Sequence, residues 1–499
     1  MAEETELKLR LAPTDVRRLR AALRRLAGPP RRTHVLSIYY DTPELALAAR
    51  GYALRIRRVG RQWVQTLKGG GGESGGLHRR EEENLKVREP RPDATALAAA
   101  GLDPASLTPV FVTDFQRESW PIAHGEARLE AALDRGVIRC GERERAFLEL
   151  ELELNAGPSR ALYQVARLLA SQIPLAPEPR SKAERGYALF EGREEAPTRA
   201  TVPPLFPRQS VDAAFATLFG HTLQQITRNQ PGVLASGDPE FLHQMRVGLR
   251  RLRALFTLFR EAVPADTWAG WAPRLRTLAA KLGQARDWDV LAMQLLPAFE
   301  ASEEMRAPHL RRAIAARRRQ AHAEVQALVG GTAYGVLMLE MGEWLASHGW
   351  RKGADASRRS LLAAPVARLA GEWLEKRRRR LLRAGEKLKW GDDVKRHRLR
   401  VQAKKLRYGL EFLGTLLPEA VRKPWLRRLS RLQDRLGELN DLAEAAQVME
   451  GWAKESRSTP RREQATRFLA WAKRQRRKAL AALPRAWKEV KRCPPLGEP

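Results

Sequence analysis

The hydrophobic pattern of this chain changes its period once, at a proline-rich stretch. Up to about residue 190, apolar and polar residues mostly alternate, as in "AFLELELELN" at 146–155. Such alternation is typical of strands that bury one face. Residues 192–208 contain four prolines, and beyond them the apolar residues recur almost throughout with the period of an α-helix. The pattern predicts an α+β multidomain protein: a β domain at 1–191, a linker at 192–208 and an all-α domain at 209–490.

Charged residues share one face of the predicted strands. In "ETELK", Glu4, Glu6 and Lys8 alternate with leucines, so the charges point to one side of the strand and the leucines to the other. Glu149, Glu151 and Glu153 repeat this arrangement in a later strand. Two helical patterns, at 13–27 and 158–172, interrupt the strands, and the glycine-rich stretch 69–76 reads as a flexible hairpin connection.

Two arrangements of these strands remain open. An ordinary sheet would turn its charged face to water. Alternatively, closure into a barrel of about eight strands would bring the acidic strands from both ends of the domain together, with the basic strands between them, around one small ligand. A tunnel of this kind suits a polyphosphate anion with a divalent metal. Carboxylates bind Mg²⁺ or Mn²⁺, and lysine and arginine neutralise the remaining phosphate charge.

The helical domain contains an internal repeat. "HQMRVGLRRLR" at 243–253 matches "HRLRVQAKKLR" at 397–407 with an offset of 154 residues, and the same offset carries Asp287 onto Asp441. The repeats span about 209–350 and 360–490. At 100° per residue, each segment is a helix with an apolar face beside a basic stripe. The two stripes consist of His243, Arg246, Arg250 and Arg253, and of His397, Arg400, Lys404 and Arg407.

The positive charge is concentrated in this helical half. The net charge is +32 overall; residues 1–200 carry 33 basic and 28 acidic residues, or +5, which leaves +27 for residues 201–499. Such a surplus implies an anionic partner: a phosphate polymer, nucleic acid or an anionic membrane surface. No aromatic platform is interleaved with the stripes, so nucleic acid is not expected as a specific partner. The run "KRRRR" at 376–380 reads as solvated helix surface.

Other features bear on location. No run of 18 apolar residues exists, so we expect no membrane span. Cys140 and Cys493 give neither a disulfide framework nor metal-ligand spacing, which fits a reducing compartment. We therefore expect a cytoplasmic protein, with association to polyphosphate granules as a further hypothesis.

The first domain resembles the CYTH superfamily of triphosphate tunnel metalloenzymes. "ETELK" matches its Glu-x-Glu-x-Lys signature, and "YYDT", "LRIR", "QTLKG", "LHRREE", "TDFQRESW", "ALDRG", "LELELEL" and "SKAERGY" follow in the order of the family. The resemblance implies an eight-stranded antiparallel β tunnel with helices. It also implies hydrolysis of small triphosphates with a divalent metal, Mg²⁺ or Mn²⁺.

The resemblance also assigns residues. Metal binding falls to Glu4, Glu6, Glu149 and Glu151, which with Lys8 form the expected catalytic set. Substrate phosphates fall to Lys8, Arg55, Arg57, Lys68, Arg80, Arg117, Lys182 and Arg185. Asp134 and Glu153 match the family pattern without a defined role. In "RREEE" an extra acid follows Arg80, and strand register favours Glu82 as the inward residue. We expect these cations to bind substrate, so that neutralising one leaves the barrel as stable as before.

The second domain is similar to CHAD domains through "LHQMRVGLRRLR", "LGQARDWDV", "HRLRVQAKKLRY" and "LGELNDL". The resemblance implies a pair of pseudo-symmetric helical bundles that bind inorganic polyphosphate, with both basic stripes in one anion site. The two histidines either contact phosphate or are ordinary structural histidines.

Together these patterns predict an inorganic triphosphatase that forms pyrophosphate and phosphate and carries a polyphosphate-binding domain. Two alternatives remain. The chain is a polyphosphate-binding or granule-associated protein with little catalysis, or its tunnel acts on another triphosphate, such as thiamine triphosphate or ATP.

Overall fold

The computed structural model describes all residues except 1, 61, 75, 94–105, 387 and 497–499. The chain forms two compact units, each considered by itself. Unit 1 contains residues 1–198, 223–234 and 328–349, and unit 2 contains residues 199–222, 235–327 and 350–499. Two segments from the helical part of the chain, beyond residue 208, therefore belong to the same unit as the β domain.

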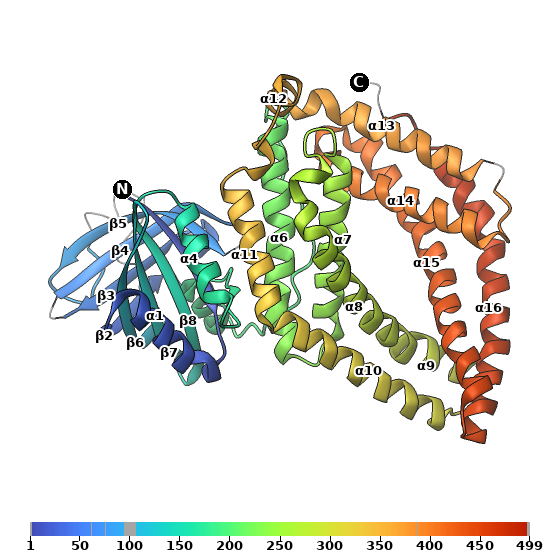
Figure 1. Ribbon diagram of the computed structural model, residues 1–499, viewed down its shortest axis with the longest axis horizontal. Helices are drawn as coiled ribbons and strands as arrows, with labels where there is room; N and C mark the ends of the chain where they lie inside the picture. The colour runs from blue at the N-terminus through green and yellow to red at the C-terminus, as the bar shows by residue number, and fades with distance from the viewer. Residues whose placement is uncertain (1, 61, 75, 94–105, 387, 497–499) are drawn as a thin grey trace. The chain divides into compact units, whose positions relative to one another are not determined.

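Unit 1 is built on an antiparallel barrel of eight strands, as predicted (Figure 1). The first strand pairs with both β5 and β8, which closes the sheet. The strands are β1 (Ala2–Arg10), β2 (Arg31–Asp41), β3 (Ala53–Val59), β4 (Gln62–Ser74), β5 (Leu77–Val87), β6 (Thr108–His124), β7 (Ala127–Cys140) and β8 (Arg143–Ala156). A two-residue strand, β9 (Ala176–Pro177), pairs with β1. Closure removes the alternative of an open sheet with a charged face in water.

The alternation of the first strand places its leucines outside the barrel and its charges inside. Leu7 and Leu9 are fully buried in an apolar cluster under the predicted helices α1 (Val16–Ala27) and α4 (Arg160–Ala170). Leu339 of α11 (Thr332–Ala346) joins the same cluster. Burial of leucine on the outer face leaves the charged side chains facing inward, which creates a polar tunnel.

Two local features differ from the sequence prediction. The glycine-rich stretch predicted to be a loop continues β4 as far as Ser74, with an irregularity in pairing between Gly69 and Gly72. Residues Lys182–Phe190 form a further helix, α5. Its N-cap is Ser181, whose hydroxyl accepts a hydrogen bond from the Glu184 amide at 3.1 Å, satisfying one of the free amides of the first turn.

Unit 2 is helical, as predicted. Its main helices are α7 (Pro239–Leu258), α8 (Ala272–Val290), α13 (Val366–Gly385), α14 (Asp393–Leu413), α15 (Glu419–Glu455) and α16 (Thr459–Lys491). Two more, α6 (Val211–Ala235) and α10 (Pro308–Val329), contribute to both units. The apolar face of α7, including Leu249, Leu252 and Phe256, is buried. No described helix is long and apolar enough to cross a membrane.

Prolines occur both inside and at the start of helices in this part of the chain. Pro231 lies inside α6, which continues to Ala235, although a proline normally ends or kinks a helix. In contrast, Pro418 stands at the N-cap of α15, where its missing amide hydrogen costs nothing.

Candidate active site and basic helices

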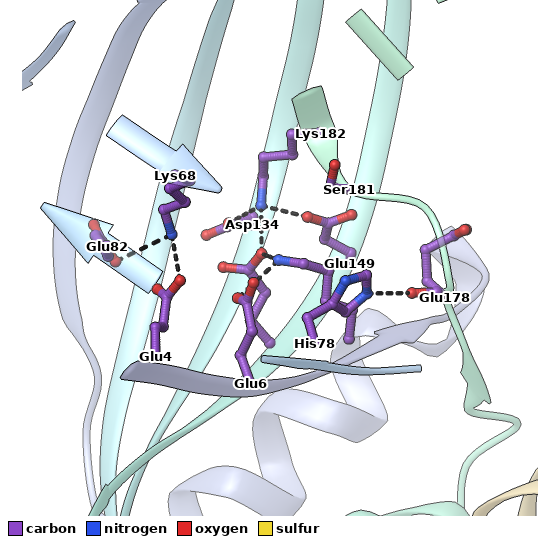
Figure 2. A network of polar contacts seen from close by, with 12 residues as sticks. Glu4, Glu6, Lys68, His78, Glu82, Asp134, Glu149, Glu178, Ser181 and Lys182 are labelled. Atoms are coloured by element: carbon purple, nitrogen blue, oxygen red, sulfur yellow. Dashed lines mark hydrogen bonds and ion pairs between the residues drawn. The ribbon is translucent and has the colours of Figure 1, made fainter. Parts of the chain in front are cut away.

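Three predicted acids inside the barrel surround one ammonium group. The Nζ atom of Lys182, in the first turn of α5, lies 2.6 Å from Asp134 Oδ2 and 2.9 Å from Glu151 Oε1, and it also pairs with Glu149 (Figure 2). Carboxylate oxygens of the three acids lie within 4.8 Å of one another. A metal ion would fit that spacing, but the lysine already occupies the middle of the group.

Further cations neutralise the same acids. Glu151 also pairs with Lys8 and with Arg117, and Arg117 binds Asp134 through two hydrogen bonds of 2.7 Å. Burial opposes ionisation of Glu151, but Lys182, Lys8 and Arg117 hold its pKa well below its ordinary value. This side of the tunnel is therefore electrostatically balanced without any ligand.

Glu149 is almost fully buried, like Asp134. It is 1% exposed and pairs with Lys182 and with Arg185. Neither Glu149 nor Arg185 lines the cavity, whereas every other predicted metal or phosphate residue of the tunnel does. The Glu149–Arg185 pair therefore lies outside the cavity lining, where Glu149 contacts Lys182, which does line the cavity.

A second acid group has fewer cations. Glu6 stands opposite Glu153 in the pairing of β1 with β8. Burial, followed by the charges of Glu4, Glu6 and Glu151, raises the pKa of Glu153 to about 7. Lys68 lies between Glu4 and Glu82, with its Nζ 3.3 Å from Glu82 Oε2 (Figure 2). Glu82 therefore faces inward, as strand register favours, and the group around Glu153 carries an excess of negative charge.

The opposite side of the cavity is cationic. The cavity is about 60 Å³, and Arg55, Arg57 and Arg80 line it together with the acids. Burial, followed by the charges of Arg55 and Arg117, lowers the pKa of Arg57 to about 10. Arg55 lies 3.5 Å from Glu82 Oε1, but Arg57 is crowded by cations, as Glu153 is crowded by acids.

Three residues that line or border the cavity were not singled out from the sequence. Tyr39 and Ser181 line it. His78 is 1% exposed, stands opposite Glu6 in the pairing of β1 with β5, and donates from Nε2 to the Glu178 carbonyl at 3.3 Å. Burial, and then Lys8, lower the pKa of His78 to about 3, so the ring is neutral. The two-residue spacing of His78 from Arg80 is the signal that places it on the inner face.

Comparison with known proteins identifies both halves of the chain. Residues 2–187 match the CYTH domain, and residues 217–450 match the CHAD domain. The chain carries a CYTH domain followed by a CHAD domain. A Haemophilus influenzae protein named inorganic triphosphatase is 34% identical over 196 residues, which are 38% of this chain and 55% of that protein. The chain thus spans about half the length of this relative.

A solved structure supports the fold of the helical half. The crystal structure of the CHAD domain from the plant Ricinus communis aligns with 60% of this chain and 98% of that chain, at 27% identity and a TM-score of 0.54. The CHAD fold is therefore established here by sequence and by structure.

The two basic stripes of the CHAD domain lie together. They run along α7 and α14, which pack against each other. Burial, followed by the charges of Arg400, Arg250 and Arg246, lowers the pKa of Lys404 to about 7. These four residues, from both repeats, form what we call the twin basic stripe. Its members come from the middle of the two stripes predicted from the sequence.

The ends of the predicted stripes are less closely associated. Arg253 and His397 are exposed, and Arg407 binds Glu411 of its own helix at 2.8 Å. His243 is partly buried, and burial, followed by Arg286, lowers its pKa to about 4. A neutral imidazole adds no charge to the stripe, so the arginines and the lysine carry its electrostatic potential.

The structure adds acids to this region. Asp287, Asp441 and Glu444 line a hollow of about 530 Å³ together with Arg246. Burial, followed by the Glu444 charge, raises the pKa of Asp287 to about 6. Asp287 and Asp441 occupy matching repeat positions, a signal that the sequence offered without a role.

Proposed function

We propose that the CYTH tunnel hydrolyses inorganic triphosphate to pyrophosphate and phosphate with a divalent metal. The observation that carries the proposal is one cavity that is lined both by Glu153, which other carboxylates crowd, and by Arg57, which other arginines crowd. A metal-bound polyphosphate anion brings counter-charge to both groups. The name of the Haemophilus influenzae relative agrees with this substrate.

The donor set favours a metal position different from the one expected. Glu4, Glu6 and Glu153 offer hard carboxylate oxygens that line the cavity, whereas Glu149 is enclosed by Lys182 and Arg185. We therefore propose Glu4, Glu6 and Glu153 as the metal-holding residues, with Mg²⁺ or Mn²⁺ as the ion. A bound divalent ion would polarise phosphate oxygens and lower the pKa of a bound water.

The chain's own residues would do the positioning. Arg55, Arg57 and Arg80 bind the phosphates on the opposite side of the cavity, and Lys68 links the two sides through Glu4 and Glu82. Phosphoryl transfer depends chiefly on positioning and charge stabilisation, which this arrangement supplies. Lys8, Lys182 and Arg117 hold Glu151 in place behind the reacting phosphate.

The test is phosphate release from triphosphate, ATP, thiamine triphosphate and long-chain polyphosphate, with Mg²⁺, with Mn²⁺ and with a chelator. We expect triphosphate to be hydrolysed fastest and the chelator to abolish turnover. Faster hydrolysis of ATP or thiamine triphosphate would make that compound the substrate instead. Turnover in the presence of the chelator would contradict metal binding by the acids. If no substrate is hydrolysed, the chain would be a polyphosphate-binding protein with little catalysis.

We further propose that the twin basic stripe binds inorganic polyphosphate. The lowered pKa of Lys404 supports it, because four cations held against one another gain from any polyanion that lies across them. Titration of the full chain with long-chain polyphosphate at two salt concentrations tests it, since polyanion binding weakens steeply with salt. Equal affinity for double-stranded DNA at equal phosphate concentration would reduce the interaction to nonspecific attraction.

A further inference from the structure

A second group of cations in the CHAD domain lies outside the twin basic stripe. It consists of Arg260, just beyond α7, Arg377 and Arg380 of α13, and Lys405 of α14, and we call it the outer basic cluster. Two of its members belong to "KRRRR", which reads from sequence as solvated helix surface. The packing of the three helices gives these two arginines a different setting.

Arg377 connects α13 with the end of α7. Its guanidinium donates to the carbonyl oxygens of Trp373 and Thr257, both at 2.9 Å, and Thr257 precedes Arg260 by three residues. Nearby, Lys376 Nζ lies 3.1 Å from the Glu261 carboxylate. These contacts hold the middle of α13 against the residues around Arg260.

A glycine brings α14 to the same place. A Cβ atom on Gly409 would lie 2.9 Å from Leu374 Cδ2 and 3.5 Å from Arg377 Cδ, so the absence of a side chain lets the helices approach. Lys405 precedes Gly409 by one helical turn and shares its face. Burial, and then Arg380, Arg377 and Arg260, lower the pKa of Lys405, which agrees with cations gathered at one point.

Arg260 of the cluster lies 3.9 Å from the Glu261 carboxylate, but the other three members differ from their neighbours in compensation. In the same run, Arg378 and Arg379 bind Glu375 at 2.7 and 3.1 Å. Among the described residues, no carboxylate lies within ion-pair distance of Arg377, Arg380 or Lys405. The run therefore divides into arginines that are neutralised and arginines that are not.

The two arginines that α13 contributes to the cluster have no basic counterpart in the other repeat. α6 and α13 begin at Val211 and Val366, an offset of 155 residues. With this offset, Arg377 and Arg380 correspond to Thr222 and Gln225, which are 1% and 4% exposed. The outer basic cluster is therefore not a product of the internal symmetry that forms the twin basic stripe.

We propose that the outer basic cluster is a second anion site, which binds the continuation of a polyphosphate chain whose preceding phosphates lie on the twin basic stripe. The proposal rests on the proposed polyphosphate binding. α14 presents both sites, because Lys404 belongs to the stripe and the next residue, Lys405, belongs to the cluster. A short chain would fill the stripe alone, whereas a long chain would engage both sites and gain affinity from the second.

The experiment compares chain lengths. The full chain, in a chelator to prevent turnover, is titrated with polyphosphates of about 10 and about 100 phosphates at several salt concentrations, where each lost contact flattens the salt dependence by about 0.7 log units. We expect R380A/K405A to bind the long chain about tenfold more weakly, with a salt slope shallower by about 1.4, and the short chain as before. Loss of like charges should leave its melting temperature unchanged or raised.

The matched control is R379A/K423A, which removes the same charge from two side chains that are each 70% exposed and ion-paired. It should bind both lengths like the parent. If the two double variants bind the long chain equally well, the proposed second site is wrong. If R380A/K405A binds both chain lengths more weakly by the same factor, the cluster and the stripe form one site. Weakened DNA binding with unaltered polyphosphate binding would assign the cluster to nucleic acid. A parent that binds no polyphosphate would contradict the proposed function itself.

Discussion

At the scale of single residues, the tunnel acids differ in whether a cation already neutralises them. Glu149 and Glu151 sit among lysines and arginines, whereas Glu153 is surrounded by other carboxylates that raise its pKa to about 7. The first two stabilise the empty barrel, and the third opposes its folding. Substitutions of equal size should therefore have opposite effects on stability.

We predict that Glu153→Gln stabilises the metal-free protein at pH 8 and abolishes most activity. A folded-state pKa of about 7, above the usual value near 4.3, means that ionisation opposes folding. The penalty is absent below about pH 4, grows with pH, and is complete above about pH 7, where it reaches at most about 3 kcal/mol. Chemical denaturation of both proteins at pH 5 and pH 8 measures it.

Glu149→Gln is the control for this prediction. It should destabilise the protein at both pH values, because Lys182 and Arg185 would lose a buried partner. If Glu153→Gln also destabilises at pH 8, or retains full turnover, the assignment of Glu153 to the metal group is wrong.

Two tunnel cations should likewise differ in how their neutralisation affects stability. Neutralising any one of them is expected from sequence to leave stability unchanged, but the ion pairs of Lys182 with three buried carboxylates favour a different prediction for this residue. We predict that Lys182→Met costs about 3 to 5 kcal/mol, whereas Arg57→Met is neutral or stabilising. Arg57 is held only by a 3.4 Å contact with Ser37 Oγ and is crowded by other arginines. Thermal melting beside kinetics tests both, and equal melting temperatures would contradict the distinction.

At the scale of elements, the pairing register of the strands determines which residues lie next to each side chain. Along β8, Glu149, Glu151 and Glu153 face Arg10, Lys8 and Glu6 of β1 in turn, so three identical residues meet two cations and one acid. Helix packing has the same effect in the CHAD domain. α7 and α14 bring four cations together, and the pKa of Lys404 falls to about 7.

We predict that polyphosphate affinity falls as pH rises from 6 to 8. The Lys404 ammonium is charged below about pH 7 and loses its charge above it, and Asp287 ionises from about pH 6, which adds repulsion of the same sign. Lys404→Arg should reduce the pH dependence, because a guanidinium stays charged. Titrations of both proteins at pH 6, 7 and 8 measure this. An identical pH profile in the variant would exclude Lys404 as the titrating group.

At the scale of the whole molecule, the tunnel unit depends on helices encoded far along the chain. α11 belongs to unit 1, where a Cβ on Gly335 would lie 1.8 Å from the Leu175 carbonyl oxygen and a Cβ on Gly342 would lie 2.5 Å from the Tyr163 ring. Small residues let this helix approach the β domain closely. The CYTH domain of this chain is thus completed by a segment within the span that matches the CHAD domain.

We therefore predict that Gly335→Ala lowers the melting temperature of the tunnel unit and its turnover at raised temperature, because a backbone oxygen cannot move aside as a side chain can. Gly451→Ala is the control, since a Cβ there meets nothing within 4 Å. It should be neutral or slightly stabilising, as alanine favours a helix over glycine. Similar melting of the two variants would show that α11 is dispensable to the tunnel.

The sequence by itself determined the kinds of element, the repeat and the inward face of each strand. These follow from periods of two and 3.6 residues, which depend only on neighbouring positions. The closed barrel and nearly all the tunnel residues were predictable for this reason, with the help of the family resemblance. α5 was missed because its short span follows an irregular segment.

Only the tertiary structure decided which charges compensate each other. The selection of Glu153 over Glu149, the neutral state of His78 and the division of "KRRRR" depend on partners brought from distant strands and helices. The same is true of α11, whose place in the tunnel unit no local pattern indicates. Electrostatic and packing free energies depend on distance in space and on burial, and neither quantity is contained in the order of residues along the chain.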